Sequence, residues 1–222
     1  MAGRGRGLRT RLAEAVARAR RRWRGVAPRT RVEVRCERAE HGGWWICPQA
    51  VRPGDVAYSF GLGGDLSFER ALAEVYGARV FAFDPAPSVE PAAATGRPEA
   101  LRHFRMSVGG KNERREVPLP GGRAVSARVL RLPSHMRMLA HRRVDLIRLD
   151  VPGVEADVIA DLVRMDVDVH QLLVGFEASR TTESRDRVEA AVTALRAHGY
   201  RVFHVSPDRR VLSFIRTDFA GR

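Results

Sequence analysis

The sequence from Asp55 to Pro85 reads DVAYSFGLGGDLSFERALAEVYGARVFAFDP, and its pattern decides the fold class. The apolar run from Val56 to Phe60 predicts a buried strand, and the glycines behind it predict a tight loop into a helix. A second apolar run, Arg79 to Phe83, predicts a strand that ends at Asp84. Strand, glycine loop, helix, strand and acid in this order are typical of a nucleotide-type cofactor site at the first crossover of a Rossmann-like sheet.

The parts of this stretch suit a bound ligand for physical reasons. Glycine has no Cβ, so the loop backbone can approach a ligand closely. Asp65 or Ser67 can cap the helix that follows, whose first amides otherwise lack partners. Asp84 lies twenty positions after Gly64, about where such folds hold ribose hydroxyls with a carboxylate. For the glycines alone, a tight turn without a ligand is the alternative interpretation.

Positive charge is concentrated at the amino terminus. The formal net charge is +13, and residues 1–35, with twelve arginines and two glutamates, account for +10 of it. We expect residues 1–30 to form a basic arm, disordered or partly helical, and residues 31–222 to form one domain. Such an arm could contact RNA or an anionic membrane surface, and a solvated arm is the alternative.

Composition indicates a globular cytoplasmic protein. Hydrophobic residues make up 44% of the chain and charged residues 29%. No apolar run approaches the roughly 20 residues that span a bilayer, and the amino terminus lacks the apolar segment of a secretory signal. Cys36 and Cys47 could form one bridge, but two free thiols are favoured in this compartment. No spacing typical of a structural zinc site is found.

The rest of the chain alternates between strand and helix patterns. Strands are predicted at 101–108, 144–149 and 170–176, and helices at 133–143, 153–165 and 184–198, with a short helix at 89–94. Hairpins are predicted at 31–51, around a turn at residues 41–43, and at 200–216, while residues 111–127 suggest a hairpin or a flexible flap. A closing antiparallel hairpin is the expected ending of the class I methyltransferase fold. We therefore predict an α/β fold with a mostly parallel Rossmann-like sheet and helices on both faces.

Several motifs resemble the FkbM family of S-adenosylmethionine-dependent methyltransferases. The most specific is YSFGLGGDLSFE at 58–69. Supporting matches are GGWW at 42–45, FAFDP at 81–85, DLIRLDVPGVE at 145–155 and GYRVFH at 199–204. The resemblance covers residues 41–216. It implies S-adenosylmethionine as the cofactor, a fold of the class predicted above and no metal.

The resemblance also implies roles for particular residues. The cofactor-binding residues would be Phe60, Gly61, Gly63, Gly64, Asp65, Asp84, Ser107 and Val108. Asp84 would hold the ribose, the glycine loop the methionine part, and Ser107 and Val108 would flank the adenine. Asp150 and Glu177 are the candidate catalytic residues, for substrate orientation or proton acceptance; a helix cap and a solvated side chain are their alternatives. His135 and His141 could supply a general base or serve structure.

The implied reaction is O-methylation of a small molecule such as a sugar or polyketide hydroxyl. An RNA methyltransferase that uses the basic arm, and a non-catalytic binding module on the same scaffold, are the alternatives. The chain departs from the family pattern at Pro152, at Gly175, where a glutamate is usual, and at Glu177, where a histidine is usual. Residues 175 and 177 point to the same face of a strand, so Glu177 could restore the carboxylate or reflect a lost activity.

Overall fold

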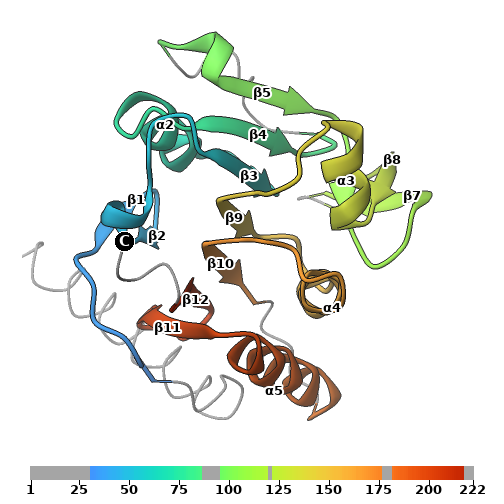
Figure 1. Cartoon of the computed structure of the whole chain (residues 1–222). Coiled ribbons are helices and arrows are strands. Elements are labelled where there is room, and N and C mark those ends of the chain that lie inside the picture. The colour runs from blue at the N-terminus through green and yellow to red at the C-terminus, as the bar shows by residue number, and fades with distance from the viewer. Residues whose placement is uncertain (1–30, 87–95, 120–121, 177–181, 218–222) are drawn as a thin grey trace, which may run out of the picture.

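A seven-stranded sheet forms the centre of the molecule in the computed structural model, which describes residues 31–86, 96–119, 122–176 and 182–217 (Figure 1). The strand order is β11-β12-β10-β9-β3-β4-β5. These strands are β3 (Val56–Phe60), β4 (Arg79–Phe83), β5 (Leu101–Phe104), β9 (Leu146–Leu149), β10 (Gln171–Gly175), β11 (Tyr200–Val205) and β12 (Val211–Arg216).

The directions of the strands match the predicted fold. Strands β5, β4, β3, β9 and β10 are parallel, while β12 runs antiparallel between β10 and β11. The chain builds outward from β3 to β5 and then returns to the other side of β3 with β9, so the order reverses between β3 and β9. This is the Rossmann-like sheet of class I methyltransferases, closed by the antiparallel hairpin, and the prediction of the fold class is confirmed.

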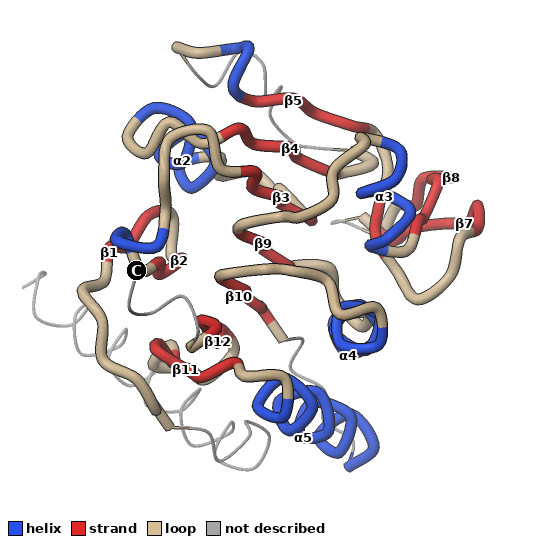
Figure 2. Tube along the Cα trace, viewed as in Figure 1, coloured by secondary structure: helices blue, strands red, loops and turns tan. Residues whose placement is uncertain are grey.

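Helices cover both faces of this sheet (Figures 1 and 2). Helix α2 (Ser67–Glu74) and the hairpin of β1 (Ala39–His41) and β2 (Trp44–Ile46) lie on one face. Helices α3 (Leu132–Met138), α4 (Glu155–Arg164) and α5 (Thr182–Ala197) lie on the other. Because side chains alternate along a strand, Tyr58 and Phe60 enter the core under α3 and α4, while Ala57 enters the core under α2.

The predicted third strand is divided in two. Strand β5 ends at Phe104, and β6 (Ser107–Val108) belongs to a separate three-stranded sheet with β7 (Glu113–Pro118) and β8 (Ala124–Leu130). Residues 107 and 108 pair with Val129 and Leu130 of β8, a partner that the local apolar pattern cannot reveal. Strands β7 and β8 are antiparallel, so residues 111–127 contain the hairpin and not the flap.

The expectation of free thiols is wrong, because Cys36 and Cys47 form a disulfide. The β1–β2 hairpin turns the chain back on itself at Gly42 and Gly43, with Ala39 opposite Ile46. Cys36 precedes this hairpin and Cys47 follows it, so their Cα atoms come within 6.2 Å of each other, a separation suited to a bridge. The bridge ties the amino-terminal segment of the domain to the α2 side of the sheet.

Three predictions concern residues outside the described part of the chain: the basic arm at 1–30, the short helix at 89–94, and Glu177. Within the described part, no helix is both long enough and apolar enough to cross a bilayer.

Candidate functional site

The candidate site lies at the carboxyl ends of the parallel strands, where β3 meets β4 and β9. Phe60 is in register with Phe83 on one side and Leu149 on the other. The amide of Gly61 donates to the carbonyl of Phe83, and the amide of Asp150 donates to the carbonyl of Phe60, each over 3.0 Å. The glycine loop, Asp84 and Asp150 therefore gather where the strand order reverses, the position at which open α/β sheets bind ligands.

Asp84 is joined to the glycine loop through its carboxylate. Its Oδ2 accepts the amide of Leu62 and its Oδ1 accepts the amide of Ala86, both over 2.8 Å. The residue is 9% exposed, and its backbone carbonyl contacts Nε2 of His103 at 2.9 Å. A carboxylate has about four acceptor positions, so each oxygen of Asp84 can still accept a hydroxyl. The group is fixed in place and keeps the hydrogen-bonding capacity that ribose recognition requires.

The glycines of the loop meet different surroundings. Gly61 has a φ of +80°, and a Cβ on it would lie 2.1 Å from the carbonyl oxygen of Asp150. Gly61 therefore allows the chain at the end of β3 to approach closely the residue that follows β9, and Gly61 itself is half-buried. Gly63 has a φ of +62° and no atom within 4 Å of its Cβ position. Gly63, Gly64 and Asp65 are exposed, so this half of the loop is open to a ligand.

Asp65 lies two residues before helix α2, whose N-cap is Leu66 without a side-chain cap, so neither Asp65 nor Ser67 caps the helix as predicted. Oδ1 of Asp65 accepts the amide of Ser67, the first residue of α2, over 2.9 Å. This hydrogen bond lowers the pKa of the Asp65 carboxyl, because it favours the charged form. The negative charge lies at the amino end of α2, where unpaired amides favour an anion.

The side chains of Phe60, Ser107 and Val108 lie in the core. The ring of Phe60 stacks on Phe83 with centroids 4.8 Å apart, and it meets the ring of His135 edge-on at 5.2 Å. The carbonyl of Ser107 lies 3.1 Å from Nε2 of His135. We therefore expect only backbone groups of these three residues to contact a cofactor. Among the other predicted residues, Gly63, Gly64 and Asp65 are exposed, Gly61 is half-buried and Asp84 is buried.

A buried charged cluster lies beneath the glycine loop, and the sequence analysis missed it. Nη1 of Arg148 donates to the carbonyl of Gly61 at 2.9 Å and to Oε1 of Glu69 at 3.0 Å. The same nitrogen lies 3.2 Å from Oγ of Ser59, which also donates to Glu69. Glu69 is fully buried and Arg148 is 5% exposed. Charged side chains can be buried only when they are paired with an opposite charge, as these two are. The cluster connects β9, β3 and α2 under the loop.

Trp44 completes the cluster. Its ring lies under the guanidinium of Arg148, with Cζ 4.5 Å from the ring centroid, and it contacts Phe68 of α2. Trp45 points to the other side of β2 and stacks on His204 at 4.8 Å. The signal for the cluster was present in the sequence as a lone arginine in an otherwise apolar strand. A charge in such a run requires a buried partner, but nothing local identifies Glu69, 79 positions away.

Asp150 is the predicted catalytic residue that the structure describes. Its Oδ2 lies 3.2 Å from Nη2 of Arg148, and its side chain is 43% exposed. A Cβ on Gly175 would lie 2.8 Å from Oδ1 of Asp150 and 3.1 Å from Trp44. The space that a larger residue at 175 would need is therefore taken by Asp150 and Trp44. The arrangement holds one half-exposed carboxylate at the edge of the sheet.

His135 and His141 have structural surroundings. His135 has no exposed surface, and burial lowers its pKa to about 4, so the ring is neutral at pH 7. Nδ1 of His141 lies 2.8 Å from the hydroxyl of Tyr58, and burial lowers the pKa of His141 as well. Both rings pack against core aromatics of β3 and β4. Of the two roles that the sequence left open for these histidines, this packing favours the structural one.

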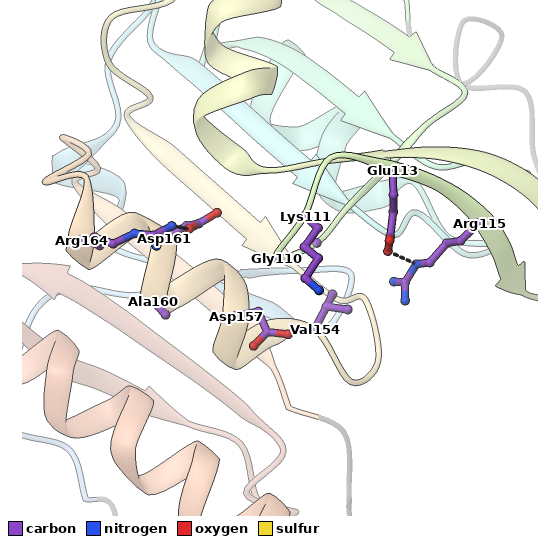
Figure 3. Close-up of a pocket in the computed structure, with 10 residues that line it drawn as sticks. Gly110, Lys111, Glu113, Arg115, Val154, Asp157, Ala160, Asp161 and Arg164 are labelled. Carbon is purple, nitrogen blue, oxygen red and sulfur yellow. Dashed lines mark hydrogen bonds and ion pairs between the residues drawn. The ribbon is translucent and has the colours of Figure 1, made fainter.

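Two grooves lie near this edge, and the predicted cofactor residues line neither. The first, of about 480 Å³, separates α4 from residues 109–115 (Figure 3). Val154, just before α4, and Asp157 of α4 face Lys111 across it, and Glu113 points toward Arg115. The second, of about 660 Å³, lies between α3 and the β7–β8 hairpin.

No protein-family model and no curated protein matches the sequence. Solved structures match at low identity. A methyltransferase FkbM from Methylobacillus flagellatus KT is 13% identical at a TM-score of 0.47, over 73% of this chain and 43% of that chain. A fibrillarin pre-rRNA processing protein from Methanococcus jannaschii is 12% identical at a TM-score of 0.47, over 77% and 69%. The antibiotic-resistance methyltransferase Kmr is 17% identical at a TM-score of 0.37, over 76% and 89%.

This chain thus spans less than half the length of the first of these proteins. At these sequence identities and TM-scores, the similarity to these structures supports no conclusion about the activity or substrate of this chain.

Proposed function

We propose that this protein is an S-adenosylmethionine-dependent methyltransferase that acts on a hydroxyl of a small molecule. One observation carries the proposal. The carboxylate of Asp84 lies 2.8 Å from the amide of Leu62, in an open glycine loop at the point where the strand order reverses. This hydrogen bond holds a carboxylate that can accept ribose hydroxyls next to a loop with exposed backbone. Both lie at the ligand-binding edge of a class I methyltransferase sheet.

The residues present fit the cofactor in two respects. Asp84 keeps free acceptor positions for two ribose hydroxyls, and Gly63 has open space where other residues carry a Cβ. Bound S-adenosylmethionine supplies a methyl group already activated on a sulfonium. The chain then has to align the acceptor and take up the proton of its hydroxyl.

We propose that Asp150 takes up the proton of the acceptor hydroxyl. Its carboxylate is half-exposed at the edge of the sheet, next to the glycine loop. Arg148 acts as a positioning residue, because one guanidinium donates both to Asp150 and to the carbonyl of Gly61. A single buried group therefore sets the distance between the loop and the proposed proton acceptor. Glu177 remains a second candidate for the same task.

Cofactor binding is tested by calorimetric titration of S-adenosylmethionine into the full chain and into Asp84→Asn. The wild-type chain should bind, and Asp84→Asn should bind at least about tenfold more weakly, because it loses a charged acceptor. Asp166→Asn is the matched control. Asp166 is exposed with a φ of +46°, which asparagine tolerates, and this change should leave binding unchanged.

The absence of heat and of any thermal shift with the wild-type chain would refute the proposal. Binding without methyl transfer to any pool of hydroxylated metabolites would instead favour a non-catalytic binding module. Deleting residues 1–30 tests the RNA methyltransferase alternative. Only under that alternative should the deletion abolish RNA affinity and its dependence on salt.

A further inference from the structure

Three arginines line the groove between α3 and the β7–β8 hairpin. They are Arg114 on β7, Arg128 on β8 and Arg137 on α3, around a volume of about 660 Å³. All three are exposed. Within the described residues, none of their guanidinium groups forms an ion pair or a hydrogen bond with another side chain. This contrasts with Arg131 just before α3, which makes two hydrogen bonds to Asp161.

Two of these arginines are forced together by the fold. Arg114 and Arg128 are direct partners in the antiparallel register of β7 and β8. Side chains at such positions lie on the same face with Cβ atoms about 5 Å apart, and like charges directly opposite each other destabilise the pair. The hairpin therefore carries a repulsion that an anion between the two guanidinium groups would remove.

The acidic groups near the groove do not balance this charge. Glu113 also lines the groove, but its carboxylate lies 3.6 Å from Nε of Arg115 and points toward it (Figure 3). Glu116 shares a strand face with Arg114 but stands opposite Ser126, two residue pairs further along the hairpin, and it does not line the groove. The groove thus presents three cations against one carboxylate, and that carboxylate already has a partner.

The walls of the groove are held at a fixed spacing. Asn112 donates through Nδ2 to Oγ of Ser134 at 2.9 Å, and its Oδ1 accepts the amide of Arg131 at 2.8 Å. These two bonds join the start of the hairpin to the first turn of α3. Arg137 therefore lies across from the β7–β8 arginines on a connected support, and binding an anion requires little rearrangement.

We propose that this groove binds the phosphate groups of a small phosphorylated ligand. Guanidinium groups bind phosphate through paired N–H donors, and the volume lies within the range of small-molecule pockets. The lining residues include no aromatic side chain on which bases of single-stranded RNA could stack, so a small ligand is favoured over RNA. The proposal is independent of methyl transfer, since it requires neither the glycine loop nor Asp84.

The test is calorimetric titration of inorganic pyrophosphate into the full chain, at about 50 mM and about 200 mM salt. The variant is Arg114→Gln with Arg128→Gln. The control is Arg35→Gln with Arg52→Gln, which removes the same charge from exposed arginines that do not line the groove. We expect the groove variant to bind at least about tenfold more weakly and the control to bind as the wild type does. Without ligand, the groove variant should melt no earlier than the wild type, because it loses a like-charge contact.

Three results would overturn the proposal. The first is the absence of binding to the wild-type chain at millimolar pyrophosphate, and the second is an equal loss of binding in both double variants. The third is tight binding of a single-stranded RNA oligonucleotide that the groove variant abolishes and pyrophosphate does not displace, which would assign the groove to RNA.

Discussion

The two faces of the central sheet are packed by different chemistry. On the face under α3, α4 and α5, the strands contribute large apolar side chains such as Tyr58, Phe83 and Leu149. On the face under α2, small residues such as Ala57 and Ala82 give way, toward the carboxyl ends, to Ser59 and Arg148.

The difference in packing indicates that one face mainly stabilises the fold and the other supports the proposed site. Apolar burial on the first face supplies folding free energy, whereas a buried ion pair adds little net stability. The cluster of Arg148 and Glu69 lies directly beneath the proposed cofactor loop and contacts its backbone at Gly61. We infer that its role is to fix the loop, and the following experiments test this contrast.

The largest effect is expected at the charged face, from Glu69→Gln. The substitution keeps the shape of the side chain but leaves Arg148 without its fully buried counter-charge. We expect the free energy of unfolding to fall by at least about 3 kcal/mol in urea titrations. The same substitution at Glu113, in an exposed pair with Arg115, should cost less than about 1 kcal/mol. Equal costs for the two variants would contradict the contrast.

On the apolar face, the free energy of unfolding should depend on pH through His135. Burial lowers the pKa of His135 to about 4, so the folded state keeps the ring neutral while the unfolded state takes up a proton below about pH 6.5. Stability should therefore fall as the pH drops from 6.5 to 4, by up to about 3 kcal/mol from this residue. His135→Gln should reduce that slope, measured as unfolding free energy against pH.

His198→Gln, at an exposed position, is the control and should leave the slope unchanged. His204, whose pKa burial also lowers to about 4, keeps its own contribution in both variants. An unchanged slope in His135→Gln would mean that this histidine of α3 can take up a proton in the folded state.

A smaller effect is expected where the two faces meet, at the glycine loop. Both Gly61 and Gly63 have positive φ, so alanine costs about 1 kcal/mol at either position for backbone reasons alone. Gly61→Ala also drives a Cβ to within 2.1 Å of the carbonyl oxygen of Asp150, whereas Gly63→Ala meets open space. We expect Gly61→Ala to cost about 2 kcal/mol more in thermal or urea unfolding. Similar costs would show that the loop is not held against β9.

Local patterns predicted the elements that depend on local sequence. Strands β3 and β4 have the predicted bounds, because an apolar run flanked by turn residues fixes both ends. The end of β5 and the start of β6 were not predicted, since Ser107 and Val108 are held by a partner on β8.

The site shows the same division between local and distant information. The glycine loop and Asp84 are signalled by residue type and spacing, and the structure joins them through Leu62. The burial of Phe60, Ser107 and Val108 could not be predicted, because it depends on α3 packing over them. The Arg148–Glu69 contact and the Cys36–Cys47 bridge likewise depend on the arrangement of distant segments.

The central claim is that the adenosyl cofactor binds at the loop between β3 and α2. A crystal structure of the full chain with S-adenosylhomocysteine tests it most directly. We predict that both ribose hydroxyls lie within hydrogen-bonding distance of the Asp84 carboxylate, with the amino-acid part of the ligand along Gly63 and Gly64. A ligand seated instead between α4 and residues 109–115, with Asp84 untouched, would contradict the account.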